Sequence, residues 1–252
     1  MINGIVAKPK QFPFVVDLHI GTNSCSGLLI TPKTVITAGH CLRINDTVMY
    51  KVYMGNIKKQ IKNKLMEKTV QLQNVSKIIL HPKFENLEVI SDGINSYDIG
   101  IIILKNPFKM TPSVKTICLK NKKRPYPKKA ISIGFGQTEH YNKTLDGGYL
   151  RYFEVDILNP IVCAVIFRAI GLAITRKEIC ASFTRAGAMC SGDSGGPLVS
   201  EIGGKYVALA IVSQGTLTQC NQPLLAQAYT KINPFENWIQ KQIGNEYNIC
   251  FV

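Results

Sequence analysis

The stretch Gly192-Asp193-Ser194-Gly195-Gly196-Pro197 is the most informative part of this 252-residue chain. At average residue frequencies, a given six-residue string occurs by chance in a chain of this length about once in 10⁵ cases. Two further stretches precede it, Thr37-Ala38-Gly39-His40-Cys41 and Asp98-Ile99-Gly100-Ile101-Ile102-Ile103-Leu104. A serine hydroxyl is a poor nucleophile near neutral pH and needs an adjacent base. The order histidine, aspartate, serine therefore points to nucleophilic catalysis.

Together these stretches resemble the chymotrypsin/trypsin family of serine endopeptidases. The resemblance implies that Ser194 is the nucleophile, that His40 is the general base, and that Asp98 orients the imidazole. It also implies an oxyanion hole formed by the backbone N–H groups of Gly192 and Ser194. A competing acid, Asp92, lies in a polar stretch, whereas Asp98 begins an apolar strand that can bury it.

Asp193 has a different implied role. In the family this carboxylate is buried and pairs with the α-amino group freed by activation cleavage, because an unpaired buried carboxylate is costly. Alignment on Ala7 and Phe12 puts Met1 in the position of the first residue. Either the Met1 amine fills this role, or Met1 is an initiator residue that replaces the native one. An extra or blocked N-terminus predicts a zymogen-like, poorly active protein.

The predicted pocket for P1, the substrate residue before the scissile bond, departs from the tryptic pattern. Ala188 and Met189 stand at its base, where trypsin-like enzymes have an acid, so a preference for Lys or Arg is not expected. Its wall reads Ser213-Gln214-Gly215, and Ser213 also matches a family serine that hydrogen-bonds the buried aspartate. Gln227 stands where relatives have glycine. Either Gln227 selects a polar P1 residue, or Gln227 and Met189 fill the pocket and misplace the substrate.

Composition and pattern predict an all-β protein. The chain is 46% hydrophobic and 18% charged, which favours a folded protein over an extended disordered one. Short β-rich runs separated by turn residues indicate a barrel or sandwich. The runs are Phe14–Ile20, Gly27–Ile30, Val48–Met54, Ile78–Leu80, Ile99–Leu104, Ala130–Ile133, Tyr149–Val155, Pro197–Val199, Tyr206–Val212 and Ala226–Ile232. The resemblance implies two six-stranded antiparallel β-barrels, in residues 1–118 and 119–252, with the active site between them.

Only the C-terminal segment has a clear helical pattern. Phe235, Trp238, Ile239 and Ile243 recur at helical spacing, and Asn233-Pro234 is the predicted cap and first turn.

Two other segments differ from trypsin-like relatives. The apolar run Ala164–Ile174 is interpreted as a helix packed on the second barrel, and the alternative is an exposed patch that meets a partner. The stretch Glu85–Tyr97 is longer than in those relatives and is expected to overhang the cleft.

The eight cysteines predict a disulfide-bonded protein. No C-x-x-C pair occurs, which argues against a zinc or redox motif. The resemblance implies three pairs, and we predict that the two remaining cysteines form the fourth. The pairs are Cys25–Cys41, Cys163–Cys180, Cys190–Cys220 and Cys118–Cys250. Sequons at Asn45, Asn74 and Asn142, together with the disulfides, favour a secreted glycoprotein.

The chain carries a net charge of +14, which would attract anionic partners. Five lysines against one glutamate in residues 56–68 make calcium implausible there, and we expect no metal or cofactor. No nucleic-acid fold accompanies the basic stretches, so a sulfated polysaccharide is the better candidate, although solubility also explains the charge. No apolar run reaches membrane-spanning length, and Met1–Gly4 is too short and polar for a signal peptide.

The sequence thus predicts a secreted, monomeric serine endopeptidase that cleaves protein or peptide substrates through an acyl-enzyme intermediate, with narrow, non-tryptic specificity. The alternative is a protease-like binding protein whose P1 pocket is occluded and whose basic surface engages other molecules.

Overall fold

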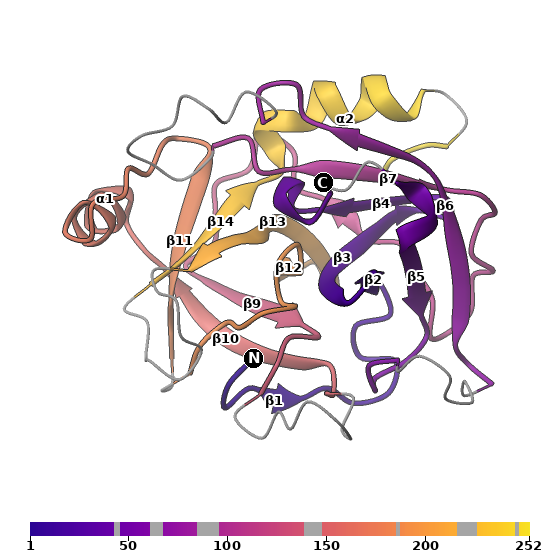
Figure 1. The fold of residues 1–252 in the computed structure, drawn as a ribbon. Coiled ribbons are helices and arrows are strands. Elements are labelled where there is room, and N and C mark those ends of the chain that lie inside the picture. The colour runs from indigo at the N-terminus through magenta and orange to yellow at the C-terminus, as the bar shows by residue number, and fades with distance from the viewer. Residues whose placement is uncertain are drawn as a thin grey trace.

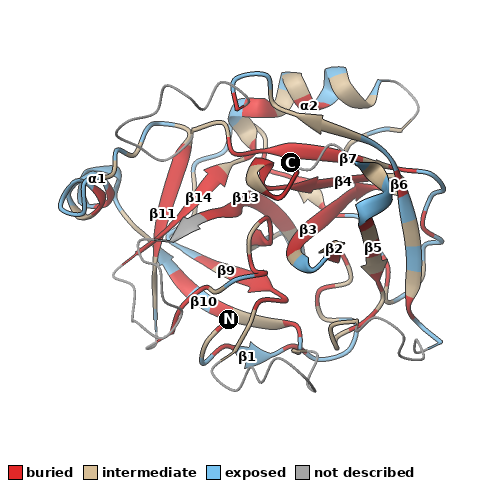
Figure 2. Ribbon diagram, in the orientation of Figure 1, coloured by how far each residue is buried: buried red, intermediate tan, exposed pale blue. Residues whose placement is uncertain are grey.

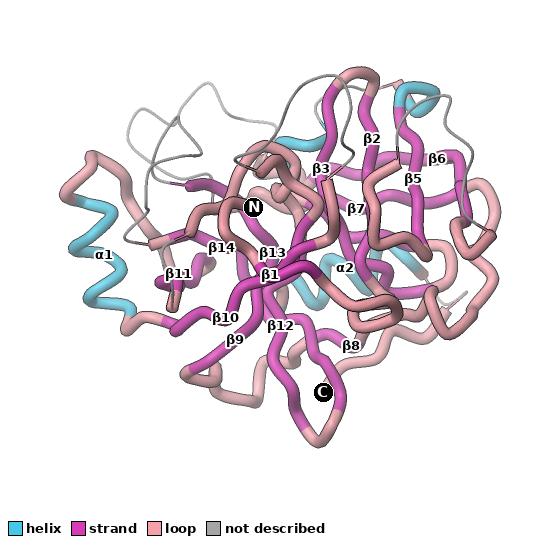
Figure 3. Tube along the Cα trace, turned by 90° about the horizontal axis from the view of Figure 1, so that it is seen from below, coloured by secondary structure: helices cyan, strands magenta, loops and turns pink. Residues whose placement is uncertain are grey.

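Two closed, six-stranded antiparallel β-barrels make up the fold, as the sequence predicts (Figure 1). The structure is a computed structural model that describes residues 1–42, 46–60, 68–84, 96–138, 148–184, 187–215, 226–244 and 247–252. Seen from below, the strands of the first barrel lie on one side of the molecule and those of the second barrel on the other (Figure 3).

The first barrel closes in the strand order β2-β3-β4-β7-β6-β5. Its strands are β2 Val15–Ile20, β3 Asn23–Thr31, β4 Thr34–Thr37, β5 Tyr50–Met54, β6 Gln71–Leu80 and β7 Gly100–Leu104. Side chains alternate between the two faces of a strand. In β5, accordingly, Tyr50, Val52 and Met54 are buried and the residues between them are half-buried. The predicted runs omit β4, because its four residues are all buried and show no such alternation.

The second barrel closes in the order β9-β10-β11-β14-β13-β12, with β12 pairing back to β9. Its strands are β9 Lys129–Gly134, β10 Arg151–Ile157, β11 Glu178–Phe183, β12 Pro197–Ile202, β13 Lys205–Gly215 and β14 Gln227–Lys231. Two short strands extend the sheet, since β1 Ile5–Val6 pairs with β10 and β8 Cys118–Leu119 pairs in parallel with β13. The N-terminal strand is therefore bonded to the second barrel, and the division at residue 118 remains a prediction.

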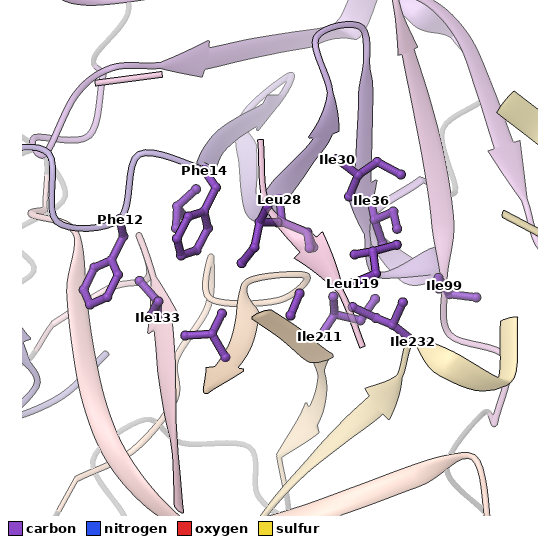
Figure 4. Close-up of a cluster of buried hydrophobic side chains, with 14 of the residues drawn as sticks. Phe12, Phe14, Leu28, Ile30, Ile36, Ile99, Leu119, Ile133, Ile211 and Ile232 are labelled. Atoms are coloured by element: carbon purple, nitrogen blue, oxygen red, sulfur yellow. The ribbon is translucent and has the colours of Figure 1, made fainter. Parts of the chain in front are cut away.

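A buried apolar cluster joins the two barrels (Figure 4). Val15, Leu28 and Ile36 lie on strands of the first barrel, whereas Ile133 and Ile211 lie on strands of the second. Burying a large aliphatic or aromatic side chain contributes about 1.5–3 kcal/mol. The cluster therefore fixes the position of one barrel against the other.

The C-terminal helix α2 spans Glu236–Ile243 and follows a 3₁₀ helix at Asn233–Phe235. Its buried Ile239 joins the interbarrel cluster. The predicted cap is wrong, because no side chain caps α2. Asn233 Oδ1 instead accepts a hydrogen bond from the Tyr126 hydroxyl at 2.6 Å.

Helix α1 spans Pro160–Arg168, so the predicted apolar helix is present but begins and ends earlier than the predicted run. It starts there because the Asn159 side chain accepts a hydrogen bond from the Ile161 N–H at 2.8 Å, and proline suits the first turn. Cys163 and Phe167 of the helix are buried, whereas Ile161 is 74% exposed. Figure 2 shows both exposed and buried stretches on α1. The interpretation as a helix packed on the second barrel is confirmed. Val165 within the predicted run is 64% exposed, and the meeting of a partner there stays a prediction.

Disulfide bonds tie distant segments to the barrels. They join Cys25 to Cys41, Cys118 to Cys250, and Cys163 to Cys180. Cys190 is also disulfide-bonded, and its predicted partner Cys220 lies outside the described residues. The Cys118–Cys250 bond spans a sequence separation of 132 and holds the C-terminal end against β8.

Several predictions from the sequence fall on residues that the structure does not describe. They concern residues 85–95 of the stretch expected to overhang the cleft, and the sequon asparagines Asn45 and Asn142. Asn74, the third sequon asparagine, is exposed on β6. None of the helices in the described ranges has the length and apolar character needed to cross a membrane.

Candidate active site

His40 and Asp98 form the centre of the candidate site. His40 lies in the 3₁₀ helix Gly39–Leu42, directly after β4. Its Nδ1 is 2.8 Å from Asp98 Oδ2, and its backbone N–H donates to Asp98 Oδ1 at 2.8 Å. A Cβ on Gly39 would come within 3.2 Å of Phe84 and of the Ile99 nitrogen. Glycine at this position therefore lets the backbone before His40 lie close to the segment that contains Asp98.

The Asp98 carboxylate is ionised although it is only 2% exposed. Burial alone would raise the pKa of this carboxyl. Electrostatic attraction to His40 and the hydrogen bonds from His40 and Ser213 outweigh burial and hold the pKa of Asp98 below its ordinary value. The shortest of these contacts is that of the Ser213 hydroxyl, which donates to Asp98 Oδ2 at 2.6 Å.

Ser194 lies with His40 in the wall of one cavity of about 460 Å³. Gly192 lines the same cavity and has a φ of +94°, a conformation that favours glycine. Within the described part of the chain, the backbone N–H groups of Gly192 and Ser194 donate no hydrogen bond. Two peptide donors thus remain available beside the candidate nucleophile.

The Asp193 side chain is completely buried and fully partnered. Its Oδ2 lies 2.9 Å from the Met1 amine and accepts a hydrogen bond from the Cys190 N–H at 2.8 Å. Its Oδ1 accepts from the Gly136 N–H at 2.8 Å. The Met1 amine also donates to the backbone carbonyl of Gln137.

Ser26, on β3, is a site residue that the sequence motifs do not reveal. Its Oγ donates to the Gly192 carbonyl at 2.8 Å and accepts from the Phe135 N–H at 3.0 Å. Its own N–H donates to the Ser194 carbonyl at 2.8 Å. Thr37 Oγ1 then donates to the Ser26 carbonyl at 2.8 Å. The only signal in the sequence is a small polar residue inside a buried strand.

Comparison with known proteins identifies the family. A family model described as Trypsin matches residues 1–239. The chain belongs to the trypsin family of serine proteases. Coagulation factor IX of Cavia porcellus is 30% identical over 244 residues, which cover 94% of this chain and 80% of that protein. Coagulation factor IX of Oryctolagus cuniculus is 30% identical over 246 residues, which cover 94% and 82%.

In this serine protease, the two residues predicted at the base of the P1 pocket are buried. Ala188 is 2% exposed, and its carbonyl accepts a hydrogen bond from the Ile2 N–H at 2.9 Å. Met189 packs in the core of the second barrel, where its sulfur accepts a hydrogen bond from Ser132 Oγ at 3.7 Å. The N-terminal segment thus supports the predicted base of the pocket.

The predicted pocket wall lies where β13 and β14 pair. Gln214 and Gly215 end β13, and Gly215 pairs with Gln227 of β14. The Gln227 side chain is almost completely buried, and its Nε2 donates to the Ala228 carbonyl at 3.2 Å. Its Oε1 has no hydrogen-bond partner among the described residues.

One cluster beside the site has the residue types of a metal centre. Ligand-type atoms of Cys25, His40 and Cys41 lie within 4.8 Å of one another. The two cysteines are bonded to each other, so neither offers the thiolate that binds metal. No other group of three such residues occurs in the described ranges.

We expect Ser213→Ala to lower the free energy of unfolding at pH 7 by about 1.5–3 kcal/mol, because it removes a hydrogen bond to an ionised carboxylate. The folded pKa of Asp98 lies below its unfolded value, so its stabilising contribution is complete above about pH 4 and is lost as pH falls. The loss caused by Ser213→Ala should therefore shrink in acid. Urea unfolding between pH 7 and pH 3 measures it.

Ser76→Ala is the control for this experiment, with all proteins made in unglycosylated form because Ser76 belongs to the Asn74 sequon. Ser76 Oγ donates to the neutral backbone carbonyl of Ile103 at 3.0 Å, so its loss should not vary across the same pH range. If Ser213→Ala lowers the free energy of unfolding by the same amount at every pH from 7 to 3, Ser213 is not a partner of the charged form of Asp98.

We expect one residue added before Met1 to lower the free energy of unfolding by about 3–5 kcal/mol, because it leaves the buried Asp193 carboxylate without its cation. Chemical denaturation of the original and extended chains measures this difference. In the Asp193→Asn variant, the same extension should lower the free energy of unfolding much less, because this variant has no buried carboxylate that could lose its cation. Equal costs in both backgrounds would show that the ion pair is not what the extension disrupts.

Proposed function

We propose that this serine protease hydrolyses peptide bonds by attack of Ser194 Oγ on the scissile carbonyl, through an acyl-enzyme intermediate. One observation carries the proposal. The hydrogen-bonded series from Ser213 through Asp98 to His40 ends in the wall of the cavity that Ser194 also lines.

His40 would act through Nε2, because its Nδ1 faces the ionised Asp98 carboxylate. Asp98 accepts the Nδ1–H, which leaves Nε2 able to take the proton from Ser194. The same imidazole would then deliver a proton to the leaving amine. The N–H groups of Gly192 and Ser194, which have no acceptor in the described part of the chain, would donate to the oxyanion.

A fluorophosphonate probe tests this function. We expect stoichiometric labelling of the chain, loss of labelling in Ser194→Ala, and a loss of at least about 10³-fold in labelling rate in His40→Ala, because the base is then absent. Mass spectrometry of the intact protein counts the labels. Ser191→Ala, which changes a serine in the wall of the same cavity, should label normally.

If the wild-type protein with a free Met1 amine does not react with the probe, the second candidate function is favoured, a protease-like binding protein with an occluded P1 pocket. The almost complete burial of Gln227 supports this second candidate. Labelling of Ser191 instead of Ser194 would reject the assigned nucleophile.

We propose that Gln227 selects a P1 side chain that donates a hydrogen bond, such as Asn, Gln, Ser or Thr. An unpaired buried acceptor costs about 1–3 kcal/mol, and the Gln227 Oε1 has no partner among the described residues. A substrate donor would satisfy it. This interpretation agrees with Ala188 at the predicted base, since no acid is present there to hold Lys or Arg.

Gln227→Gly should change the P1 preference from polar residues to large apolar ones. Removal of the side chain deletes the acceptor and opens space, so the ratio of kcat/KM for Asn and Phe substrates should change by about 10²-fold. Competition between two peptides that differ only at P1 measures the ratio. An unchanged ratio would mean that Gln227 does not contact P1.

We propose that the pairing of Met1 with Asp193 is the active arrangement and that longer N-termini are zymogen-like. We also propose a secreted chain, because disulfide bonds persist in oxidising compartments. Glycosylation, a monomeric state and binding of sulfated polysaccharide remain predictions from the sequence.

A further inference from the structure

Lys59 places a cation inside the cavity that Ser194 and His40 line. It lies in the segment after β5, and its backbone N–H donates to the Gly148 carbonyl at 2.7 Å. A Cβ added to Gly192 would come within 3.2 Å of the Lys59 Nζ. The ammonium is therefore packed against the residue that contributes one of the two available peptide donors.

Within the described ranges, this ammonium has two acceptors, and both are neutral. Lys59 Nζ donates to Ser24 Oγ at 2.6 Å and to the Phe135 carbonyl at 3.2 Å. An ammonium has three donors, so the described residues leave one for a ligand. A donor of this kind prefers a carboxylate, because charge-assisted hydrogen bonds are about twice as strong as neutral ones.

Three buried carboxylates near this cavity are already paired with other groups. Asp17 Oδ2 accepts a hydrogen bond from the Gln60 N–H at 3.0 Å. Asp193 is buried with the Met1 amine, and Asp98 is buried with His40 and Ser213. No acidic residue lines the cavity within the described part of the chain. Within the described part of the chain, Lys59 is thus a cation of the cavity wall with no carboxylate partner, and a substrate could supply one.

The position of this cavity indicates which part of a substrate would meet Lys59. The residues assigned to the P1 pocket do not line it, whereas Ser24 and the Cys25–Cys41 disulfide do. A peptide lies across the nucleophile with P1 on one side and the leaving segment on the other. Extended chain advances about 3.3–3.6 Å per residue, so the first two residues after the scissile bond, P1′ and P2′, lie within reach.

We infer that Lys59 is a specificity-determining residue that binds a carboxylate at P1′ or P2′ of the substrate, an assignment that rests on the proposed protease function. The carboxylate comes either from an Asp or Glu side chain or from the free C-terminus of a short substrate. Both present the same charged acceptor to the third donor of the ammonium.

The neighbouring Lys58 provides the contrast that makes this assignment specific. Lys58 Nζ lies 5.5 Å from the centre of the Tyr149 ring, and Lys58 lines a different cavity. Two adjacent lysines of equal charge therefore differ in whether they reach the candidate site. A general effect of positive charge would involve both lysines, whereas a subsite involves only Lys59.

The test uses amidated, internally quenched peptides that carry Glu or Gln at P1′, P2′ or P3′, and a second set that ends in a free carboxylate at P2′. Wild-type protein should cleave the better Glu peptide about tenfold faster than its Gln counterpart, measured as kcat/KM at low ionic strength. In Lys59→Met the ratio should fall to about one, and in Lys59→Glu it should invert. Lys58→Met should keep the wild-type ratio.

Each outcome decides between the subsite and a simpler role. An equal loss for Glu and Gln peptides in Lys59→Met would overturn the subsite, because Lys59 would then act on every substrate alike. A preference confined to P3′, or a ratio that Lys58→Met changes equally, would also overturn it. A preference for the free carboxylate over Glu would support the subsite and identify the C-terminus as the source.

A binding measurement separates failure of this inference from failure of the protease function. Ser194→Ala protein is titrated with fluorescein-labelled Glu and Gln peptides, and anisotropy gives the two dissociation constants. Tighter binding of the Glu peptide that disappears in Lys59→Met on the same background supports the subsite even if wild-type protein proves inert. Equal affinities for the two peptides would reject it whether or not the protein is active.

Discussion

The buried carboxylate of Asp193 is the constraint on which the candidate site depends. Moving a carboxylate out of water costs several kcal/mol, and this is recovered only where both oxygens are paired. The partners of Asp193 come from three separate parts of the chain: the Met1 amine, the Gly136 N–H and the Cys190 N–H. Because all three must converge on one carboxylate, the adjacent residues Gly192 and Ser194 are held in a single arrangement.

That convergence needs space that only glycine leaves. A Cβ on Gly136 would lie 2.3 Å from the Asp193 carboxylate, and one on Gly134 would lie equally close. From the opposite side, Ser26 of the first barrel binds the carbonyls of Gly192 and Ser194. The nucleophile loop belongs to the second barrel but is positioned by the first, so the interbarrel cluster is part of what aligns the site (Figure 4).

The sequence predicts most of the strands and the candidate nucleophile because short runs of residues encode them. The two-barrel arrangement and the roles of His40 and Asp98 are implied by the family resemblance, which rests on equally short motifs. Ser26 is not revealed by a short run, since its contact with Gly192 joins positions 166 residues apart. The prediction that Asn233 caps the helix is wrong for the same reason. The local pattern assigns the Asn233 side chain to the helix, but this side chain accepts a hydrogen bond from the distant Tyr126. The neutral partners of Lys59 are equally non-local.

The charge of Lys59 connects the proposed chemistry with the release of product. Lys59 places a positive charge in the wall of the cavity, in a chain of net charge +14. On the proposed mechanism, such a charge would attract an acidic leaving segment as it arrives. Acylation would then free an α-amino group on that segment, with an ordinary pKa of about 7.7–8.0. Near neutral pH this new cation would lie close to Lys59 and be repelled by it, which would weaken binding of the leaving segment once its peptide bond is broken. The cation that favours binding of an acidic substrate therefore does not have to slow departure of its product.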